Sequence, residues 1–259
     1  MSIGESIKKG FAITKKSGSL IVLLLVFSFI FNLIQVFLAP ATTDPATPPP
    51  PALILAGAIF IFLSIYFQSG SMGFVRDLIK TGSASLSNFR ASAGKYYIRL
   101  LLLGIVVSIL IGVFVLLAAL SMGFLKDKLA PVGVILAIFF GALGIYFVIL
   151  LFLAPYAVVV DEKGVGESIK ISTKLVKKNI LVLLGLSLLL VLIGFGIGLV
   201  LGGILAGVSY LIKAQTVTQV IFALLSSVVN AYLGVAVTGA FMNFYLSLDR
   251  KSTRLNSSH

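Results

Sequence analysis

The sequence contains no cysteine and no tryptophan, and its single histidine, His259, is the last of 259 residues. Without cysteine the chain has no disulfide, no thiolate metal ligand and no cysteine nucleophile. With histidine only at the end, its side chains supply neither a Ser-His-Asp triad nor a histidine-rich metal cluster. We therefore expect no metal, no cofactor and no catalytic residue, and we predict that the protein is not an enzyme.

Charge is also scarce. Charged residues make up 11% of the chain and hydrophobic residues 59%, and the mean hydropathy is +1.16. A soluble domain carries about 25% charged residues, so most of this chain must have lipid as its solvent. The net charge of +12 is a balance found in proteins that bind nucleic acid. Here, however, the charges lie between long uncharged stretches, which argues against a nucleic-acid partner.

Six uncharged intervals divide the chain: 17–43, 45–75, 100–125, 129–160, 179–212 and 214–248. Each exceeds the ~20 residues that a spanning helix needs, and none alternates in polarity as a spanning β-strand would. The sequence predicts an all-α polytopic transmembrane helical bundle, with three helical hairpins in one transmembrane domain over 1–248. The predicted spans are about 19–39, 52–72, 98–122, 132–158, 180–211 and 217–247.

The basic residues alternate between the connections. Of the 20 lysines and arginines, 17 lie in four connections, 1–18, 69–99, 161–179 and 249–259, and the intervening connections hold the other three: Lys126, Lys128 and Lys213. Positively charged loops resist translocation, so we expect a multi-pass protein of the cell membrane with both termini in the cytoplasm. The alternative, a cleaved signal peptide, is disfavoured because the first apolar run is longer than the ~7–15 residues of a signal core.

An internal repeat links two of the basic connections. The first connector, residues 3–18, and the third connector, residues 165–180, align without a gap and share a Gly-Glu-Ser-Ile-Lys sequence and a later Lys-Lys pair. A looser third copy of the repeat runs from Ser85 to Lys95, in the second connector, and matches the first at Ser6, Lys16 and little else. Each connector precedes an apolar span, so we expect three parallel units, each an amphipathic connector helix followed by a helical hairpin.

Helical spacing places the lysines of the connectors on one face. An apolar row of Ile3, Ile7 and Phe11 runs along the first connector, and Val165, Ile169, Ser172 and Val176 line the third. A basic amphipathic helix beside a bilayer lies in the interface, with its apolar face in the acyl boundary and its lysines among anionic headgroups. The predicted contacts with anionic lipid are Lys8, Lys15, Lys16, Lys170, Lys174, Lys177 and Lys178. The alternative is that these lysines only set the topology.

The spans themselves contain polar residues but no charge. Asn32, Gln35, Gln68, Asn230 and Asn243 are expected to form hydrogen bonds between helices. Charges inside membrane spans normally mark ion pathways and proton relays, so their absence argues against proton-coupled transport. It leaves open a path for a neutral or amphiphilic solute.

Glycines in the fifth span recur every four residues at Gly194, Gly198 and Gly202. Such a row lets a neighbouring helix approach closely. We therefore predict that this span packs against small residues of the sixth, at Ser226, Ala231, Gly234 and Gly239 among others. In the fourth span Pro155 predicts a kink.

The segment 152–179, FLAPYAVVVDEKGVGESIKISTKLVKKN, resembles a broad group of prokaryotic six-span proteins similar to the membrane domain of glycerophosphodiester phosphodiesterases. The resemblance implies a lipid-facing domain and carries no catalytic residue onto this chain, because the soluble phosphodiesterase domain is missing. The polar residues 249–259 are expected to be a disordered or artefactual tail.

Together these features favour a non-enzymatic membrane module that organises membrane lipid, a protein partner or further copies of itself. The alternative is a transporter or channel for a neutral or amphiphilic solute, which a polar cavity between the helices would support. A remoter alternative, an enzyme acting on lipid, would need Asp77, Asp161 and Glu162 to converge.

Overall fold

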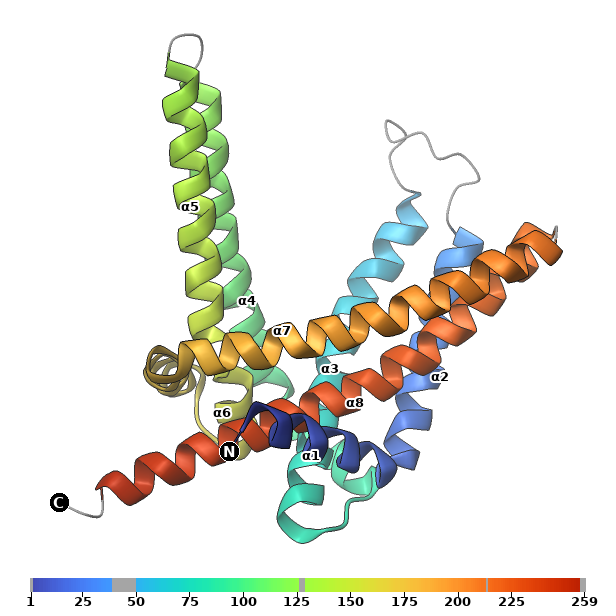
Figure 1. The fold of residues 1–259 in the computed structure, drawn as a ribbon, viewed down its shortest axis with the longest axis horizontal. Coiled ribbons are helices and arrows are strands. Elements are labelled where there is room, and N and C mark those ends of the chain that lie inside the picture. The colour runs from blue at the N-terminus through green and yellow to red at the C-terminus, as the bar shows by residue number, and fades with distance from the viewer. Residues whose placement is uncertain (1, 39–49, 126–128, 213, 257–259) are drawn as a thin grey trace. The chain divides into compact units, whose positions relative to one another are not determined.

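A computed structural model describes residues 2–38, 50–125, 129–212 and 214–256. Lys126, Lys128 and Lys213 of the predicted topology lie outside this range. Every element in the described part is a helix (Figure 1). The helices are α1 (Ile3–Lys15), α2 (Gly18–Leu38), α3 (Pro51–Thr81), α4 (Leu86–Phe124), α5 (Ala130–Leu151), α6 (Ala154–Val160), α7 (Val165–Leu211) and α8 (Gln215–Asn256).

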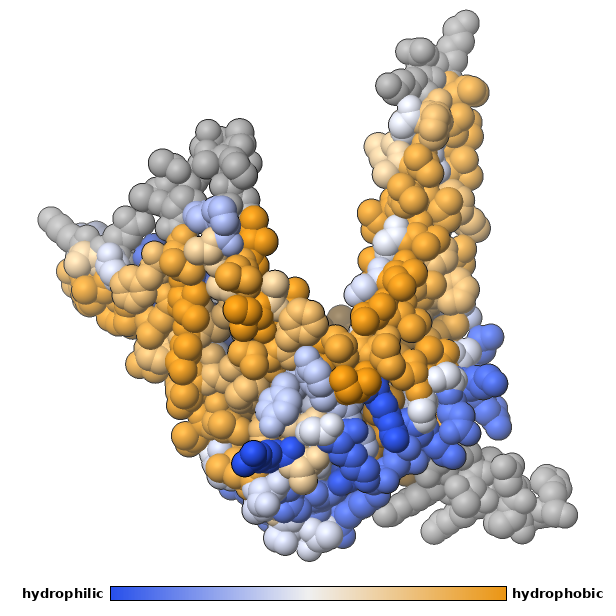
Figure 2. Space-filling view, turned by 180° about the vertical axis from the view of Figure 1, so that it is seen from behind, coloured by the Kyte–Doolittle hydropathy of each residue, from blue (hydrophilic) through white to orange (hydrophobic). Residues whose placement is uncertain are grey.

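Six helical segments are long and apolar enough to cross a membrane, which confirms the predicted all-α fold and indicates a multi-pass membrane protein. They are Gly18–Leu38, Pro51–Thr81, Leu86–Phe124, Ala130–Val160, Val165–Leu211 and Thr216–Leu248. Large apolar side chains on them are exposed, including Ile109 at 62% and Ile138 at 67%. Figure 2 shows hydrophobic residues over the long helices and hydrophilic residues near the connectors. Lipid is the solvent that such surfaces require.

The second connector continues into its span as one helix, α4. The third connector begins α7, but the non-helical backbone of Asn179 (φ −133°, ψ 23°) separates it from the span that follows. In the first connector α1 ends at Lys15 and α2 begins at Gly18. Asn179 aligns with Ser17, which lies between α1 and α2, so the helix is interrupted at the same position of the repeat in the first and third connectors. At the other end of the chain α8 reaches Asn256, so the first part of the predicted tail is helical.

The chain divides into two compact units, Met1–Lys95 with Leu181–His259, and Tyr96–Ile180. In the first unit, α8 packs against α1, α2 and α3. Asn32 of α2 donates hydrogen bonds to the Ser227 hydroxyl at 2.9 Å and the Ala223 carbonyl at 3.4 Å, both on α8. The interhelical bond predicted for Asn32 is thereby confirmed. Phe27 of α2 stacks on Phe67 of α3, with ring centroids 4.0 Å apart.

The second unit contains a long hairpin of α4 and α5, which lie side by side (Figure 1). A Cβ added at Gly144 of α5 would lie 3.0 Å from Cβ of Phe114 on α4. Phe114 also stacks on Phe147 with centroids 5.6 Å apart. Gly144 thus allows the two helices of the hairpin to approach closely.

The predicted kink at Pro155 is a complete break. Helix α5 ends at Leu151 and α6 begins at Ala154, with Pro155 in its first turn. Proline has no N–H to continue the helix, so the chain leaves backbone groups near the break to be satisfied elsewhere. Ser172 of the third connector does so: its hydroxyl donates to the Leu150 carbonyl at 2.7 Å and accepts from the Leu153 N–H at 3.1 Å.

Replacing Ser172 by alanine is expected to lower the free energy of unfolding by about 2 kcal/mol, because the variant leaves a buried N–H and a buried carbonyl without this partner. Denaturant titration of the purified protein in mixed micelles measures the loss. Ser121→Ala is the control, because the Ser121 hydroxyl donates only to Leu117 of its own helix. Equal losses in the two variants would show that Ser172 does not stabilise the break.

Candidate functional site: basic connectors and a polar cavity

The first connector helix, α1, has a buried face of small and apolar residues. Ser6, Gly10, Ile13 and Thr14 are buried, and α1 packs chiefly on α8. A Cβ added at Gly10 would collide with the carbonyl oxygen of Ala236 and lie 2.9 Å from Cβ of Ala240. The backbones of α1 and α8 therefore touch at Gly10, which fixes α1 against the bundle.

The third connector has the same arrangement. Its buried residues are Ser168, Ser172, Leu175 and Val176. The lysines of both connectors are exposed: Lys8, Lys15, Lys16, Lys170, Lys174, Lys177 and Lys178. The side chains predicted to contact anionic lipid thus project from helices that are anchored on their opposite faces.

The first and third connectors each have a carboxylate near the start, and each of these carboxylates is paired with a lysine. Glu5 lies 2.9 Å from Lys9, and Glu167 lies 3.6 Å from Lys163. The hydrogen bond and positive charge of Lys9 lower the pKa of Glu5. Within the described residues, no carboxylate neutralises any of the seven lysines predicted to contact lipid.

Part of the predicted apolar face contacts protein. Ser172 and Val176 are buried, so the expectation that they lie in the acyl boundary is wrong. In the first connector the Phe11 ring lies 6.2 Å from that of Tyr232 on α8. The sequence interpretation missed the face of Ser6, Gly10 and Thr14, although their spacing of four residues is the pattern of close helix packing.

The glycines of α7 that were predicted to pack on α8 have no close neighbour among the described residues. A Cβ added at Gly194, Gly198 or Gly202 would meet no described atom within 4 Å. Gly239 of α8 faces α1 instead, where an added Cβ would lie 3.2 Å from Cα of Gly10. Gly239, one of the small residues of α8 that were predicted to face α7, therefore packs on α1.

The carboxylates considered for a lipid-active enzyme take part in structural contacts. Glu162 accepts a hydrogen bond from the Tyr96 hydroxyl at 2.9 Å, and its backbone carbonyl accepts from Arg99 at 2.8 Å. Asp77 accepts from Arg76 at 2.8 Å and from Asn88 at 3.2 Å. In the described part of the chain, no three His, Cys, Asp or Glu side chains are grouped as a metal site would require.

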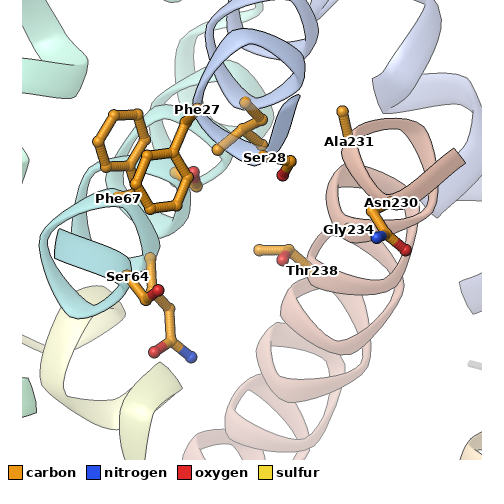
Figure 3. Close-up of a pocket in the computed structure, with 11 residues that line it drawn as sticks. Phe27, Ser28, Ser64, Phe67, Asn230, Ala231, Gly234 and Thr238 are labelled. Carbon is orange, nitrogen blue, oxygen red and sulfur yellow. The ribbon is translucent and has the colours of Figure 1, made fainter. Parts of the chain in front are cut away.

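A cavity of about 220 Å³ with a mixed polar and apolar lining lies between α2, α3 and α8 of the first unit (Figure 3). Its wall includes Leu24 and the Phe27–Phe67 pair, which make one side apolar. The polar lining comes from all three helices: Ser28, Ser64, Gln68, Ser71, Asn230 and Thr238. Gln68 and Asn230 were expected to join helices; the structure places both around this space.

Residues 1–248 match a family described as "Domain of unknown function (DUF7847)". This match and the six apolar helices support a polytopic membrane protein and show no link to the phosphodiesterases of the resemblance. No curated protein and no solved structure matches the chain.

Proposed function

The chain belongs to the DUF7847 family, and on that premise we propose that it is a non-enzymatic membrane module that gathers anionic lipid headgroups at its basic connector helices. The observation that carries the proposal is the pair of opposite faces on each of these helices, with small and apolar residues buried in protein on one face and exposed lysines on the other. A lysine near an anionic surface contributes on the order of 1 kcal/mol of attraction. Anchored helices hold several such charges in a fixed arrangement.

The proposal includes an orientation in the cell membrane with the connectors and both termini in the cytoplasm. It is supported by the 17 basic residues in alternate connections. The cytoplasmic leaflet is the anionic one, so this orientation would bring the lysines to the lipid that they attract.

We also propose that the three connectors are copies of one repeated unit. The buried residues Ser6, Gly10, Ile13 and Thr14 align one to one with the four buried residues of the third connector. With Ser85 aligned to Ser6, the buried residues Phe89, Ser92 and Ala93 of the second connector fall at the positions of Gly10, Ile13 and Thr14. Each connector also packs on the end of another span: the first on α8, the second on α3 and the third at the α5–α6 break.

Native mass spectrometry of the protein released from nanodiscs of mixed neutral and anionic lipid tests the proposal. Changing six lysines of the connectors to glutamine is expected to reduce the retained anionic lipid by more than tenfold, since each removes about 1 kcal/mol of attraction. The substituted residues are Lys8, Lys15, Lys16, Lys170, Lys177 and Lys178. Raising the ionic strength should weaken retention by the unmodified protein in the same direction.

A matched control separates a site from net charge. The triple variant Lys8→Gln/Lys15→Gln/Lys16→Gln loses as much charge as the triple variant of Lys126, Lys128 and Lys213. We expect only the first to lose anionic lipid. Equal retention in the unmodified protein and both triple variants would leave the lysines as topology signals and refute the proposal.

The cavity between α2, α3 and α8 favours a second candidate, a transporter for a neutral or amphiphilic solute. Flux of an uncharged solute into proteoliposomes, abolished by filling the cavity, would support it. The lysine variants distinguish the two candidates, because none of these lysines lines the cavity.

A further inference from the structure

Two hydroxyl groups at the cavity have no hydrogen-bond partner among the described residues. They belong to Ser64 and Ser71 of α3, and both oxygens are buried. The Ser71 side chain as a whole is only 6% exposed. In Figure 3, Ser28, Ser64 and Thr238 reach from three helices toward the same space.

Other serines in these helices satisfy their hydroxyls locally. Ser69 donates to the Tyr66 carbonyl at 2.8 Å, and Ser226 and Ser227 donate to carbonyls of α8 at 2.7 and 2.6 Å. Bonding to the preceding turn is the usual solution for a serine in a membrane helix, since no water is at hand. The hydroxyls of Ser64 and Ser71 depart from it, and an uncompensated buried hydroxyl is unfavourable.

We propose that the cavity binds the headgroup of an uncharged lipid that carries at least two hydroxyl groups, such as a monoacylglycerol, which supplies the partners that Ser64 and Ser71 lack among the described residues. Two hydroxyls are needed because the two serines are seven residues apart on α3, or about 10 Å along a helix that rises ~1.5 Å per residue. The ligand is uncharged because none of the described lining residues is charged and a buried ion without a counter-charge is strongly disfavoured. Gln68, Asn230 and Thr238 offer further donors and acceptors around the same headgroup.

The size and the wall of the cavity indicate an amphiphile. A space of about 220 Å³ is smaller than the ~300–1,000 Å³ pockets that enclose a drug-sized ligand, so it admits a headgroup and not a whole lipid. The Phe27–Phe67 pair provides an apolar wall for the first part of the chain. Residues that neighbour the lining residues along the chain, such as Leu63 next to Ser64, are apolar and exposed and belong to the surface that lipid covers.

Photolabelling of the full chain in nanodiscs tests this site. The probe is a glycerol monoester of a twelve-carbon acid with a diazirine in its chain, and a second probe is the methyl ester of the same acid, which lacks the two hydroxyls. We expect the glycerol ester to label peptides of α2, α3 and α8 around the cavity, and glycerol monolaurate to compete at least fivefold better than methyl laurate. Ser64→Ala and Ser71→Ala should each weaken competition by about three- to tenfold, the effect of one hydrogen bond.

Filling the cavity should abolish specific labelling. Gly234 lines it, and a Cβ added there meets nothing within 4 Å, so Gly234→Leu adds bulk without a clash at the backbone. Gly141→Leu on α5 is the matched control, because its Cβ also meets nothing within 4 Å. Ser226→Ala controls for the loss of a serine hydroxyl. Labelling is compared only among variants whose melting temperature equals that of the unmodified protein.

The outcomes separate the alternatives. Equal labelling by both probes would overturn the proposal. So would equal labelling of the unmodified protein and of Gly234→Leu, in which the cavity is filled. Competition by glycerol as strong as that by glycerol monolaurate would overturn the lipid in favour of a small polyol. The connector lysines do not enter this experiment, so its result is independent of the anionic-lipid proposal.

Discussion

Replacing Gly10 by leucine is expected to detach α1 from α8 and to be among the most destabilising changes in the chain. A Cβ at this position falls on the carbonyl oxygen of Ala236 and lies 2.8 Å from the backbone nitrogen of Ala240. Backbone atoms of a spanning helix cannot rotate away as a flexible side chain can. We expect a loss of more than about 3 kcal/mol of docking free energy, beyond the usual ~1–3 kcal/mol for an overpacked core.

Hydrogen exchange measured by mass spectrometry checks this prediction locally. The amides of α1 (Ile3–Lys15) should exchange more than tenfold faster in Gly10→Leu, while those of the α4–α5 hairpin stay unchanged. Gly4→Leu is a control within the same helix, because a Cβ there meets nothing within 4 Å. Similar protection of α1 in both variants would show that Gly10 does not hold the helix in place.

The result also bears on the function. If α1 must be anchored for its lysines to act together, Gly10→Leu should reduce anionic-lipid selectivity although every lysine is still present. If the lysines attract lipid only through their summed charge, the variant should retain selectivity. Gly10→Leu leaves the net charge unchanged, so it distinguishes a site of fixed lysines, which it should disrupt, from attraction by the summed charge, which it should not affect.

The number and type of the spans could be predicted from the sequence because they depend on properties of each segment alone. Each span is long, apolar and uncharged, and the membrane leaves helices as the solution for such segments. The connector helices followed from the spacing of Lys170, Lys174, Lys177 and Lys178 for the same reason. The interruption at Pro155 could also be predicted from the local sequence. The hydrogen bond by which Ser172 satisfies the Leu150 carbonyl beside it could not, because Ser172 lies in another helix.

The contacts between helices could not be obtained in this way. The glycines at 194, 198 and 202 and the glycine at 10 have similar local patterns, yet only Gly10 meets another helix among the described residues. Which small face meets which neighbour depends on the rotation and height of both helices. The cavity has the same origin: Gln68 and Asn230 are 162 positions apart, and no pattern along the chain brings them to one space.

Replacing Gly73 by valine is the second change expected to have a large effect, at the junction of α3 with the second connector. A Cβ at Gly73 would overlap the side chain of Ser92, and one at Gly70 would lie 2.5 Å from the Phe89 ring. We expect Gly73→Val to lower the free energy of unfolding by more than about 2 kcal/mol, as a bulky residue forced into a closed contact does. Gly57→Val in the same helix is the control, because that site has open space.

The obstacle at Gly73 is a side chain, so this contact can be relieved where that at Gly10 cannot. Gly73→Ala should be destabilising alone, and Ser92→Gly should cost about 0.5 kcal/mol through helix propensity. Their combination removes the overlap, so the double variant should be more stable than the sum of the two losses predicts, by at least about 1 kcal/mol in a double-mutant cycle. Additive losses would show that the α3 contact does not position the second connector. A clear coupling would show that close glycine packing holds this connector, as the structure indicates for the first at Gly10.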